Sequence, residues 1–153
     1  MKKQIVLEYD YSYGGVLLRA TYADIYDAIE RSKSGSLLVL NSPSILITET
    51  VYSSNREDNQ AKTLTLAANQ DCEITVESGI KYAFSILEKD TFNFGLTAAI
   101  KSMIEGAGFN VGEITVKANN DLTGLIYNAE NVNLYSTVKI VGTGVKKWHF
   151  SCR

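Results

Sequence analysis

The sequence predicts an α+β domain dominated by short strands, in antiparallel or mixed sheets, with two amphipathic helices. Short runs rich in Val, Ile, Thr and Tyr recur with a period of two between turn residues, which is typical of half-buried strands. Two other segments have apolar residues at the three-to-four-residue spacing of a helix. A β-solenoid-like stack is the alternative architecture, because short alternating strands also suit repeating rungs.

Length and composition favour one domain over residues 1–153. This length is near the commonest domain size, and the content of 45% hydrophobic and 21% charged residues is typical of globular chains. The only proline is Pro43, and no Gly/Ser-rich or single-sign charged run marks a linker.

The first two strands should form an N-terminal hairpin. Gln4–Tyr9 and Val16–Arg19 flank a turn that contains Gly14 and Gly15, and glycine adopts positive φ readily. The later strands are expected at Ser36–Leu40, Ile45–Tyr52, Thr63–Ala67, Glu73–Glu77, Lys81–Leu87, Glu113–Ala118, Leu122–Tyr127, Val132–Val141 and Val145–Phe150.

The first helix should begin at Thr21 and end at Ser34-Gly35. Thr21 can cap the free amides of the first turn, and Asp24 can complete a capping box. The apolar stripe of this helix is Tyr22, Ile25, Tyr26 and Ile29.

The second helix should carry a wider stripe and pack across a sheet. Gly106 and Gly108 are placed to end it. Its stripe is Phe92, Leu96, Ala99, Ile100, Met103, Ile104 and Ala107.

The tetrapeptide Glu-Ile-Thr-Val occurs twice, at Glu73–Val76 and Glu113–Val116. A degenerate internal duplication explains this repeat, and so does chance recurrence of strand-forming residues.

The charge balance and the apolar runs exclude several classes of partner. With 15 Lys+Arg against 17 Asp+Glu, the net charge of −2 provides no field that would attract nucleic acid or an anionic membrane. No apolar run approaches the roughly 20 residues of a membrane helix. Glu8 and Asp10 interrupt the first apolar stretch, so we expect no signal peptide.

The residues that most often carry catalysis are too isolated to form a site. Cys72 and Cys152 belong to no metal-binding motif, which favours two reduced structural thiols, with a disulfide as the alternative. His149 is the only histidine, and three residues along a strand would turn it away from Cys152. Gly142-Thr-Gly144 lacks the spacing of a phosphate-binding loop. We expect no metal, no other cofactor and no catalytic residue.

The acidic residues raise the hypothesis of a carboxylate-dependent hydrolase, which is the least favoured of the three functional hypotheses. Alternation along a strand places Glu73 and Glu77 on one face, which an outward polar sheet face explains. The acidic residues in this part of the chain are Glu49, Glu57, Asp58, Asp71, Glu73 and Glu77.

Tyrosine is the most distinctive residue of the chain, with nine copies. Tyrosine is enriched where protein surfaces meet, and Tyr9, Tyr11 and Tyr13 should alternate onto one face of the first hairpin. The polar run 53–62 is a candidate recognition loop. The predicted interaction surface is therefore Tyr9, Tyr11, Tyr13, Asn55, Arg56, Glu57 and Asp58.

Residues 21–52 combine a short capped helix with β-rich sequence, and the helix has the pattern Thr-Tyr-x-Asp-Ile-x-x-Ala-Ile. In this the chain resembles small structural or accessory proteins of bacteriophages and other mobile elements. The resemblance implies a setting in the virion or the host cytoplasm, and it supplies no catalytic residues. Its pattern positions are Thr21, Tyr22, Asp24, Ile25, Ala28 and Ile29.

The leading hypothesis is a non-enzymatic structural or interaction protein that acts as a homo-oligomer or assembly subunit, because short strands with unprotected edges are best tolerated when those edges are paired. The alternative is a module that binds a small ligand or a host protein, such as a phage-encoded antagonist of a bacterial defence system.

Overall fold

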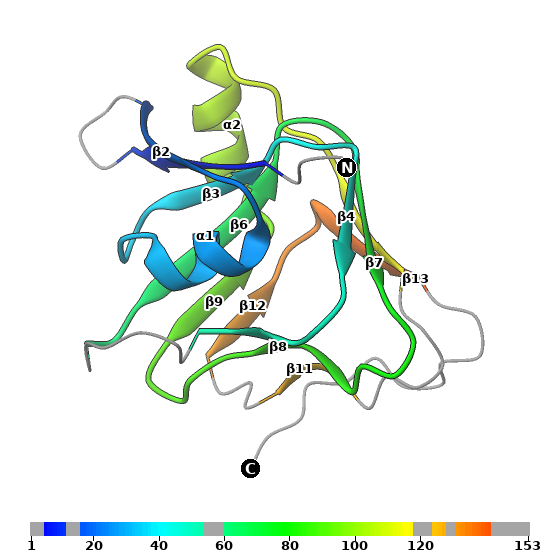
Figure 1. Cartoon of the computed structure of the whole chain (residues 1–153). Helices are drawn as coiled ribbons and strands as arrows, with labels where there is room; N and C mark the ends of the chain where they lie inside the picture. Colours follow the sequence, from blue (N-terminus) through cyan, green and yellow to red (C-terminus); the bar gives the residue numbers. More distant parts are fainter. Residues whose placement is uncertain (1–4, 12–15, 54–59, 118–123, 128–130, 142–153) are drawn as a thin grey trace.

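The computed structural model is a three-sided stack of mostly parallel strands, described for residues 5–11, 16–53, 60–117, 124–127 and 131–141 (Figure 1). Its elements are β1 (Val6–Asp10), β2 (Leu17–Tyr22), α1 (Ile25–Arg31), β3 (Leu37–Leu40), β4 (Ser44–Ile47), β5 (Val51–Tyr52), β6 (Thr63–Ala68), β7 (Cys72–Val76), β8 (Tyr82–Ser85), β9 (Thr91–Phe94), α2 (Ala98–Gly106), β10 (Ile114–Lys117), β11 (Gly124–Tyr127), β12 (Val132–Leu134) and β13 (Val138–Val141).

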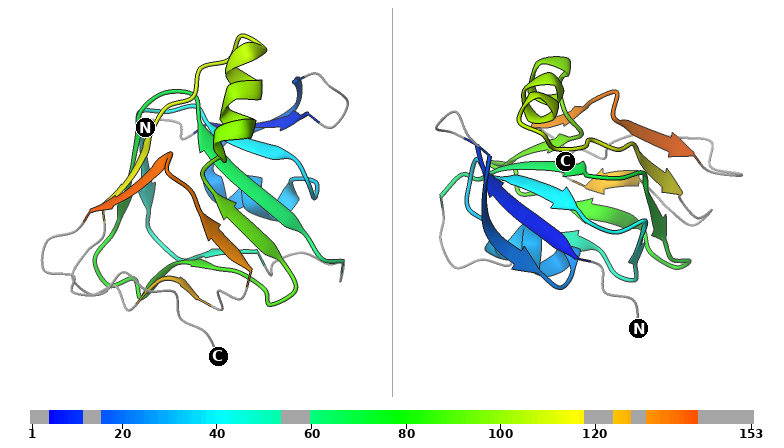
Figure 2. Two further views of the ribbon diagram at one scale, coloured as in Figure 1. Left: turned by 180° about the vertical axis from the view of Figure 1, so that it is seen from behind. Right: turned by 90° about the horizontal axis from the view of Figure 1, so that it is seen from above.

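Each turn of the chain contributes one strand to each of three sheets. The first sheet has the order β12-β9-β6-β3-β1-β2, the second β13-β10-β7-β4 and the third β11-β8-β5. The turns are thus β3 to β5, β6 to β8 and β9 to β11, and β12 and β13 begin a fourth. Seen along the stack, the sheets form the sides of a triangle (Figure 2).

The β-dominated α+β class with two helices is confirmed, but most of the strand pairs are parallel. Among the described strands, only β1 with β2 and β1 with β3 pair antiparallel. The remaining strands stack as rungs, as the alternative architecture expected. Ile45–Tyr52 and Val132–Val141, each predicted as one strand, are each divided in two because the chain turns a corner within them.

Equivalent apolar residues of successive turns stack into columns inside the triangle. Leu38 pairs with Leu66 and Leu66 with Phe94, each 28 residues further along the chain. The centre contains three fully buried rings, those of Phe84, Phe92 and Phe94, with centroids 5.2 to 5.6 Å apart. Because parallel stacking repeats the same inward positions, a continuous core forms from short strands.

Helix α1 covers the N-terminal end of this core. Its buried residues are Ile25, Ala28 and Ile29, and it lies against β5, β1 and β2 (Figure 1). The predicted start at Thr21 is wrong. Thr21 belongs to β2, where it pairs with Leu7, and the cap is Asp24, whose Oδ1 accepts the amide of Asp27 at 2.8 Å.

Lys62 connects this end helix to the second turn of the stack. Its side chain is buried, and its Nζ donates to the carbonyls of Ile29 at 2.8 Å and Glu30 at 3.2 Å. These carbonyls lie in the last turn of α1, where a cation satisfies groups that have no partner within the helix. The backbone amide of Lys62 donates to the buried Asp90 at 2.9 Å, which extends the connection to the third turn.

Helix α2 is inserted between β9 and β10 and covers the outer face of the first sheet. Ile104 packs with Leu37, Val39 and Ala67 in a second apolar cluster. The prediction that this helix begins near Phe92 is wrong, because the alternating Phe92 and Phe94 form β9 and enter the core columns.

The second helix therefore starts after its N-cap Thr97, whose Oγ1 accepts the amide of Ile100 at 3.1 Å. Met103, expected on the buried stripe, is 44% exposed. No helix of the described residues is long and apolar enough to cross a membrane.

The two Glu-Ile-Thr-Val segments stack on each other in β7 and β10, with a shift of two residues. Glu73 pairs with Thr115, and Ile74 pairs with Val116. Ile74 and Val116 face the core, while Glu73 and Glu77 lie outward as predicted. Nζ of Lys117 is 3.1 Å from Oε2 of Glu73 across the outer face.

We expect Ile29→Asp to unfold the protein, because it places a charge in the fully buried contact between α1 and the core. The cost should exceed about 4 kcal/mol. Ile100 is only half-buried, so Ile100→Asp should cost less. Urea denaturation followed by circular dichroism measures both, with the exposed Met103→Asp as the control. Native-like stability of Ile29→Asp would contradict the placement of α1.

Candidate functional site

The predicted interaction surface is described in part. Tyr9 and Tyr11 lie on one side of the first hairpin, as their alternation predicts, and both pack against the cluster beneath α2. Both are half-buried, and the ring of Tyr9 meets that of Phe109 edge-on at 5.3 Å. The other predicted residues lie outside the described part of the chain: Tyr13, Asn55, Arg56, Glu57 and Asp58.

The apolar surface beside Tyr9 continues onto β2. Leu18 pairs with Tyr9, so the two side chains lie on the same face of the hairpin. Leu18 is 57% exposed and Leu17 is 69% exposed, the highest values among the large apolar side chains that the structure describes. Leu17 pairs with Asp10 and so lies on the other face of the hairpin. We call Tyr9 and Leu18 the hairpin surface.

A small apolar cleft opens beside the hairpin surface. It has a volume of about 20 Å³, and its lining includes Tyr9, Val16, Ile104 and Phe109. This is room for about one water-sized group. One apolar side chain of a partner would therefore be enough to fill it.

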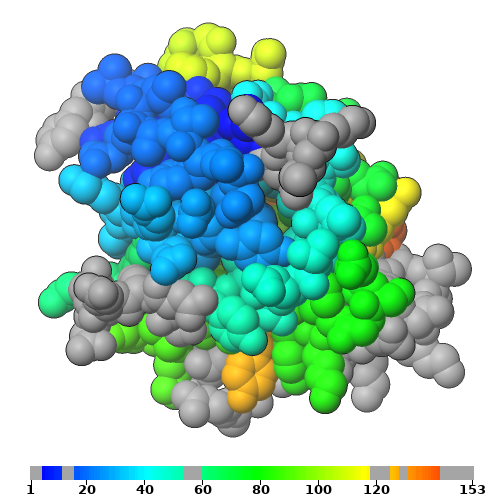
Figure 3. Space-filling view, viewed as in Figure 1, coloured from blue at the N-terminus to red at the C-terminus, as the bar shows by residue number. Residues whose placement is uncertain are grey.

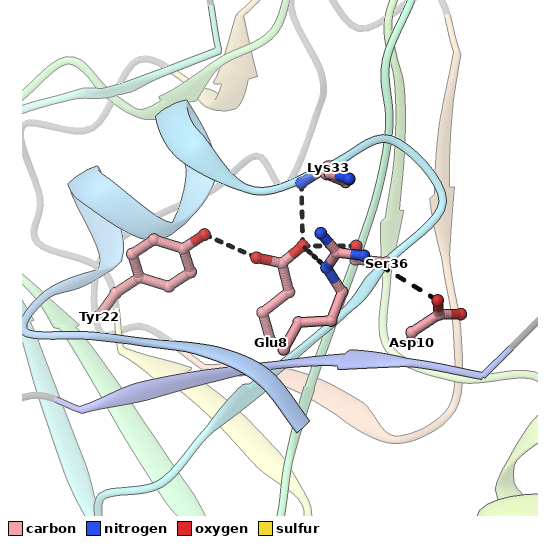
Figure 4. A network of polar contacts seen from close by, with 6 residues as sticks. Glu8, Asp10, Tyr22, Lys33 and Ser36 are labelled. Carbon is pink, nitrogen blue, oxygen red and sulfur yellow. Dashed lines mark hydrogen bonds and ion pairs between the residues drawn. The ribbon is translucent and has the colours of Figure 1, made fainter. Parts of the chain in front are cut away.

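A buried carboxylate fixes the hairpin to the end of the stack (Figure 4). Glu8 of β1 accepts the hydroxyl of Tyr22 at 2.6 Å, the hydroxyl of Ser36 at 2.6 Å and the backbone amide of Lys33 at 2.9 Å. Nε of Arg19 lies 3.6 Å from Oε2 of Glu8. One side chain thus connects β1, β2 and the segment that leads from α1 into β3.

Hydrogen bonding keeps this carboxylate ionised despite its burial. Burial alone raises the pKa of Glu8, but hydrogen bonds from Ser36, Tyr22 and the Lys33 amide, with the charge of Arg19, bring the pKa below its ordinary value. Burial and the acceptor Glu8 raise the pKa of Tyr22, so this hydroxyl stays a donor.

The charged side chain of β2 lies close to carboxylates of its own hairpin. Arg19 is the only charged residue of Leu17–Tyr22, and its guanidinium lies within 4.0 Å of both Glu8 and Asp10. Lysine and proline, which protect many exposed sheet edges, are absent from β2. The edge of the first sheet therefore presents backbone groups and leucines.

The carboxylates of the second sheet surround a separate pocket of about 270 Å³. Oδ1 of Asp71 accepts the amide of Glu113 at 2.9 Å, and Glu73 pairs with Lys117. Within the described ranges, no three His, Cys, Asp or Glu side chains are grouped to hold a metal ion.

Cys72 lines this pocket as a free thiol, as the sequence predicts. Burial, with the nearby Glu73, raises the pKa of Cys72 to about 11, so the thiol is not poised as a nucleophile. His149 and Cys152 lie outside the described residues.

No protein-family model matches this chain, and searches of curated proteins and of solved structures found no match. Function must therefore be inferred from the residues of the chain itself.

Sequence reasoning located the hairpin but missed Leu17 and Leu18. Because the two leucines are adjacent, the sequence shows no apolar–polar alternation there, and such alternation is the signal that distinguishes an exposed from a buried position. The useful signal was the combination of a terminal hairpin with a strand that lacks edge-protecting residues.

We expect Glu8→Gln to lower the free energy of unfolding by about 1–3 kcal/mol at neutral pH, because the amide cannot accept the same set of charge-assisted bonds. Urea denaturation measures this cost. The matched control is Glu105→Gln on the exposed side of α2, which should leave stability unchanged within about 0.5 kcal/mol. Equal stability of the two variants would contradict the anchoring role of Glu8.

The same carboxylate should make stability depend on pH. The folded-state pKa of Glu8 lies below its ordinary value of 4.5, so its contribution is complete above that pH and is lost as the pH falls through the folded value. The stability difference between the unsubstituted protein and Glu8→Gln should therefore shrink on acidification. Melting curves from about pH 7 to about pH 3 test this, and a difference that stays constant would refute it.

Proposed function

We propose that this chain is a non-enzymatic assembly subunit that pairs with a second copy of itself through β2. The observation that carries the proposal is the pair of exposed leucines, Leu17 and Leu18, on β2, the edge strand among the described strands of a six-stranded sheet. Large apolar side chains on an exposed strand edge favour pairing with another strand.

A second copy suits this edge because an antiparallel strand edge is self-complementary about a twofold axis. The amides of one copy face the carbonyls of the other, and the same patch serves both. Arg19 is held by Glu8 and Asp10 of its own hairpin, so two copies of β2 can meet with little repulsion between like charges.

The Glu8 network supports the edge as a rigid template. It joins β2 to β1 and to the segment that leads from α1 into β3, so little order has to be gained when a partner strand docks. Figure 3 shows residues of β2 and α1, in blue, at the surface of the molecule.

The resemblance to small structural and accessory proteins of bacteriophages agrees with an assembly role in the virion or the host cytoplasm. In this chain the apolar positions of the pattern, Ile25, Ala28 and Ile29, are the buried residues of α1. The helix that carries the resemblance therefore closes the stack, and the hairpin before it makes the proposed contact.

Size-exclusion chromatography with light scattering tests the proposal. We expect a mass near twice 16.9 kDa that persists over a dilution series. Leu18→Glu should shift the protein to the monomer, because each copy would bring a charge into the contact and like charges there cost several kcal/mol. Its melting temperature at monomer-forming dilution should change little, since Leu18 is exposed.

The matched control is Leu46→Glu on the outer face of the second sheet, where the leucine is 42% exposed. This variant should keep the mass of the unsubstituted protein. A monomer at every concentration, or loss of the oligomer in Leu46→Glu but not in Leu18→Glu, would exclude pairing through β2.

A further inference from the structure

A second surface lies on the third sheet, away from the hairpin. Three tyrosines from three turns of the stack line a shallow groove of about 220 Å³. Its lining is Thr50, Tyr52, Tyr82, Ser85 and Tyr127. Figure 3 shows β11, in orange, at the lower rim of the molecule.

The stacking of turns sets the spacing of these rings. Tyr52 pairs with Ser85, and Ser85 pairs with Tyr127, so the three residues follow one another across the sheet. Neighbouring strands lie about 4.8 Å apart, which separates the backbones of Tyr52 and Tyr127 by about 10 Å. Tyr82 packs on Tyr127 with ring centroids 5.0 Å apart.

The groove is held in shape from beneath. Oγ1 of Thr50 donates to the carbonyl of Tyr82 at 2.7 Å and so fixes the approach of β5 to β8. Inward of the tyrosines, Val51, Phe84 and Ile126 form a fully buried column. A rigid sheet that presents rings on a packed support is preorganised for a ligand.

Among the described residues, none uses the tyrosine hydroxyls in the groove. Elsewhere, Tyr22 donates to Glu8, and the hydroxyl of Tyr26 accepts the amide of Thr48 at 3.0 Å. The hydroxyls of Tyr52, Tyr82 and Tyr127 make no hydrogen bond to other residues of the described ranges. They can therefore donate to or accept from a ligand, beside the hydroxyl of Ser85.

We propose that this groove binds a neutral oligosaccharide. None of the lining residues that the structure describes is charged, so an anionic ligand would find no counter-charge among them. Sugar rings combine a C–H face, which stacks on an aromatic ring, with hydroxyls at the edge, which hydrogen-bond to phenols. The backbone separation of about 10 Å between the outer tyrosines matches two linked sugar rings.

The size of the groove favours a sugar over a protein. A stable protein interface needs about 20 to 30 residues from each partner, whereas this groove has a lining of five. A nucleotide would bring a phosphate into a site whose described lining residues offer no cation. The site is also independent of the β2 edge, so it can bind ligand in a monomer or in an oligomer.

Affinity electrophoresis and calorimetry test the proposal. The probes are soluble neutral polysaccharides of β-linked glucose, α-linked glucose, mannose, galactose and N-acetylglucosamine, with polygalacturonate as the anionic comparison and adenosine as a planar non-sugar. We expect at least one neutral polysaccharide to retard the protein and its hexasaccharide to give a saturable titration. Tyr52→Ala and Tyr127→Ala should each weaken binding roughly tenfold, and Tyr127→Phe, which keeps the ring, should lose less.

The matched control is Tyr135→Ala, which removes a half-exposed tyrosine outside the groove and should leave the affinity unchanged. Circular dichroism shows whether each variant is folded. If Tyr127→Ala does not fold, Tyr127→Phe still tests the contribution of the Tyr127 hydroxyl. If none of the neutral probes binds, the proposal is overturned. Binding only of adenosine or polygalacturonate, or binding that Tyr52→Ala and Tyr127→Phe leave unchanged, also overturns it.

Discussion

A stack of parallel turns exposes its apolar interior at the end where it begins, and covering that end is the condition on which this structure depends. Residues of the first turn are as buried as those of the middle: Ile47 and Val51 have no exposed surface, like Leu66 in the second turn. Val51 reaches this burial because α1 lies against β5. Repeat architectures in general need a distinct terminal unit for this reason, since an unmodified first repeat would leave one face in water.

Two buried charges fix this cover in position. Glu8 holds β2 and the segment after α1 to β1, and Lys62 binds the last carbonyls of α1 from the second turn. A buried charge is costly unless it is fully paired, so an end helix displaced from either contact would leave an unsatisfied group. Apolar packing alone would allow the helix to slide, whereas these contacts select one position. The same constraint that closes the core therefore also makes the outer edge rigid.

Local patterns were enough to predict most strands, but not how the strands pair. The alternation of Glu73–Glu77 shows one buried and one solvent face, and the structure agrees. Parallel pairing depends on residues 24 or more positions apart, and within the first sheet the step of 28 from Leu66 to Phe94 grows to 40 from Phe94 to Leu134, because α2 intervenes. Phe92 and Leu96 were misassigned because their spacing of four also fits a helix.

The candidate sites were hidden for related reasons. The residues of the tyrosine groove are separated by 30 and 45 positions in the sequence, so only the register of the turns brings Tyr52, Tyr82 and Tyr127 together. On the hairpin, the tyrosines were identified by composition, but the exposed leucines beside them depend on which strand lies at the sheet edge. Exposure at an edge follows from the whole sheet and cannot be found in a window of sequence.

The insertion of α2 shows where this scaffold accepts additional chain. The corner between the first and second sheets takes three residues after β3, β6 and β12, and nineteen after β9. The chain nevertheless rejoins the stack in register, through Gly112, whose amide donates to the carbonyl of Ala68 at 2.9 Å. A side chain at Gly112 would collide with the backbone of Gln70, so the re-entry point is narrow although the excursion is long. For protein engineering, the short corner 41–43, which does not face Gly112, is thus the natural place to graft a foreign segment for display.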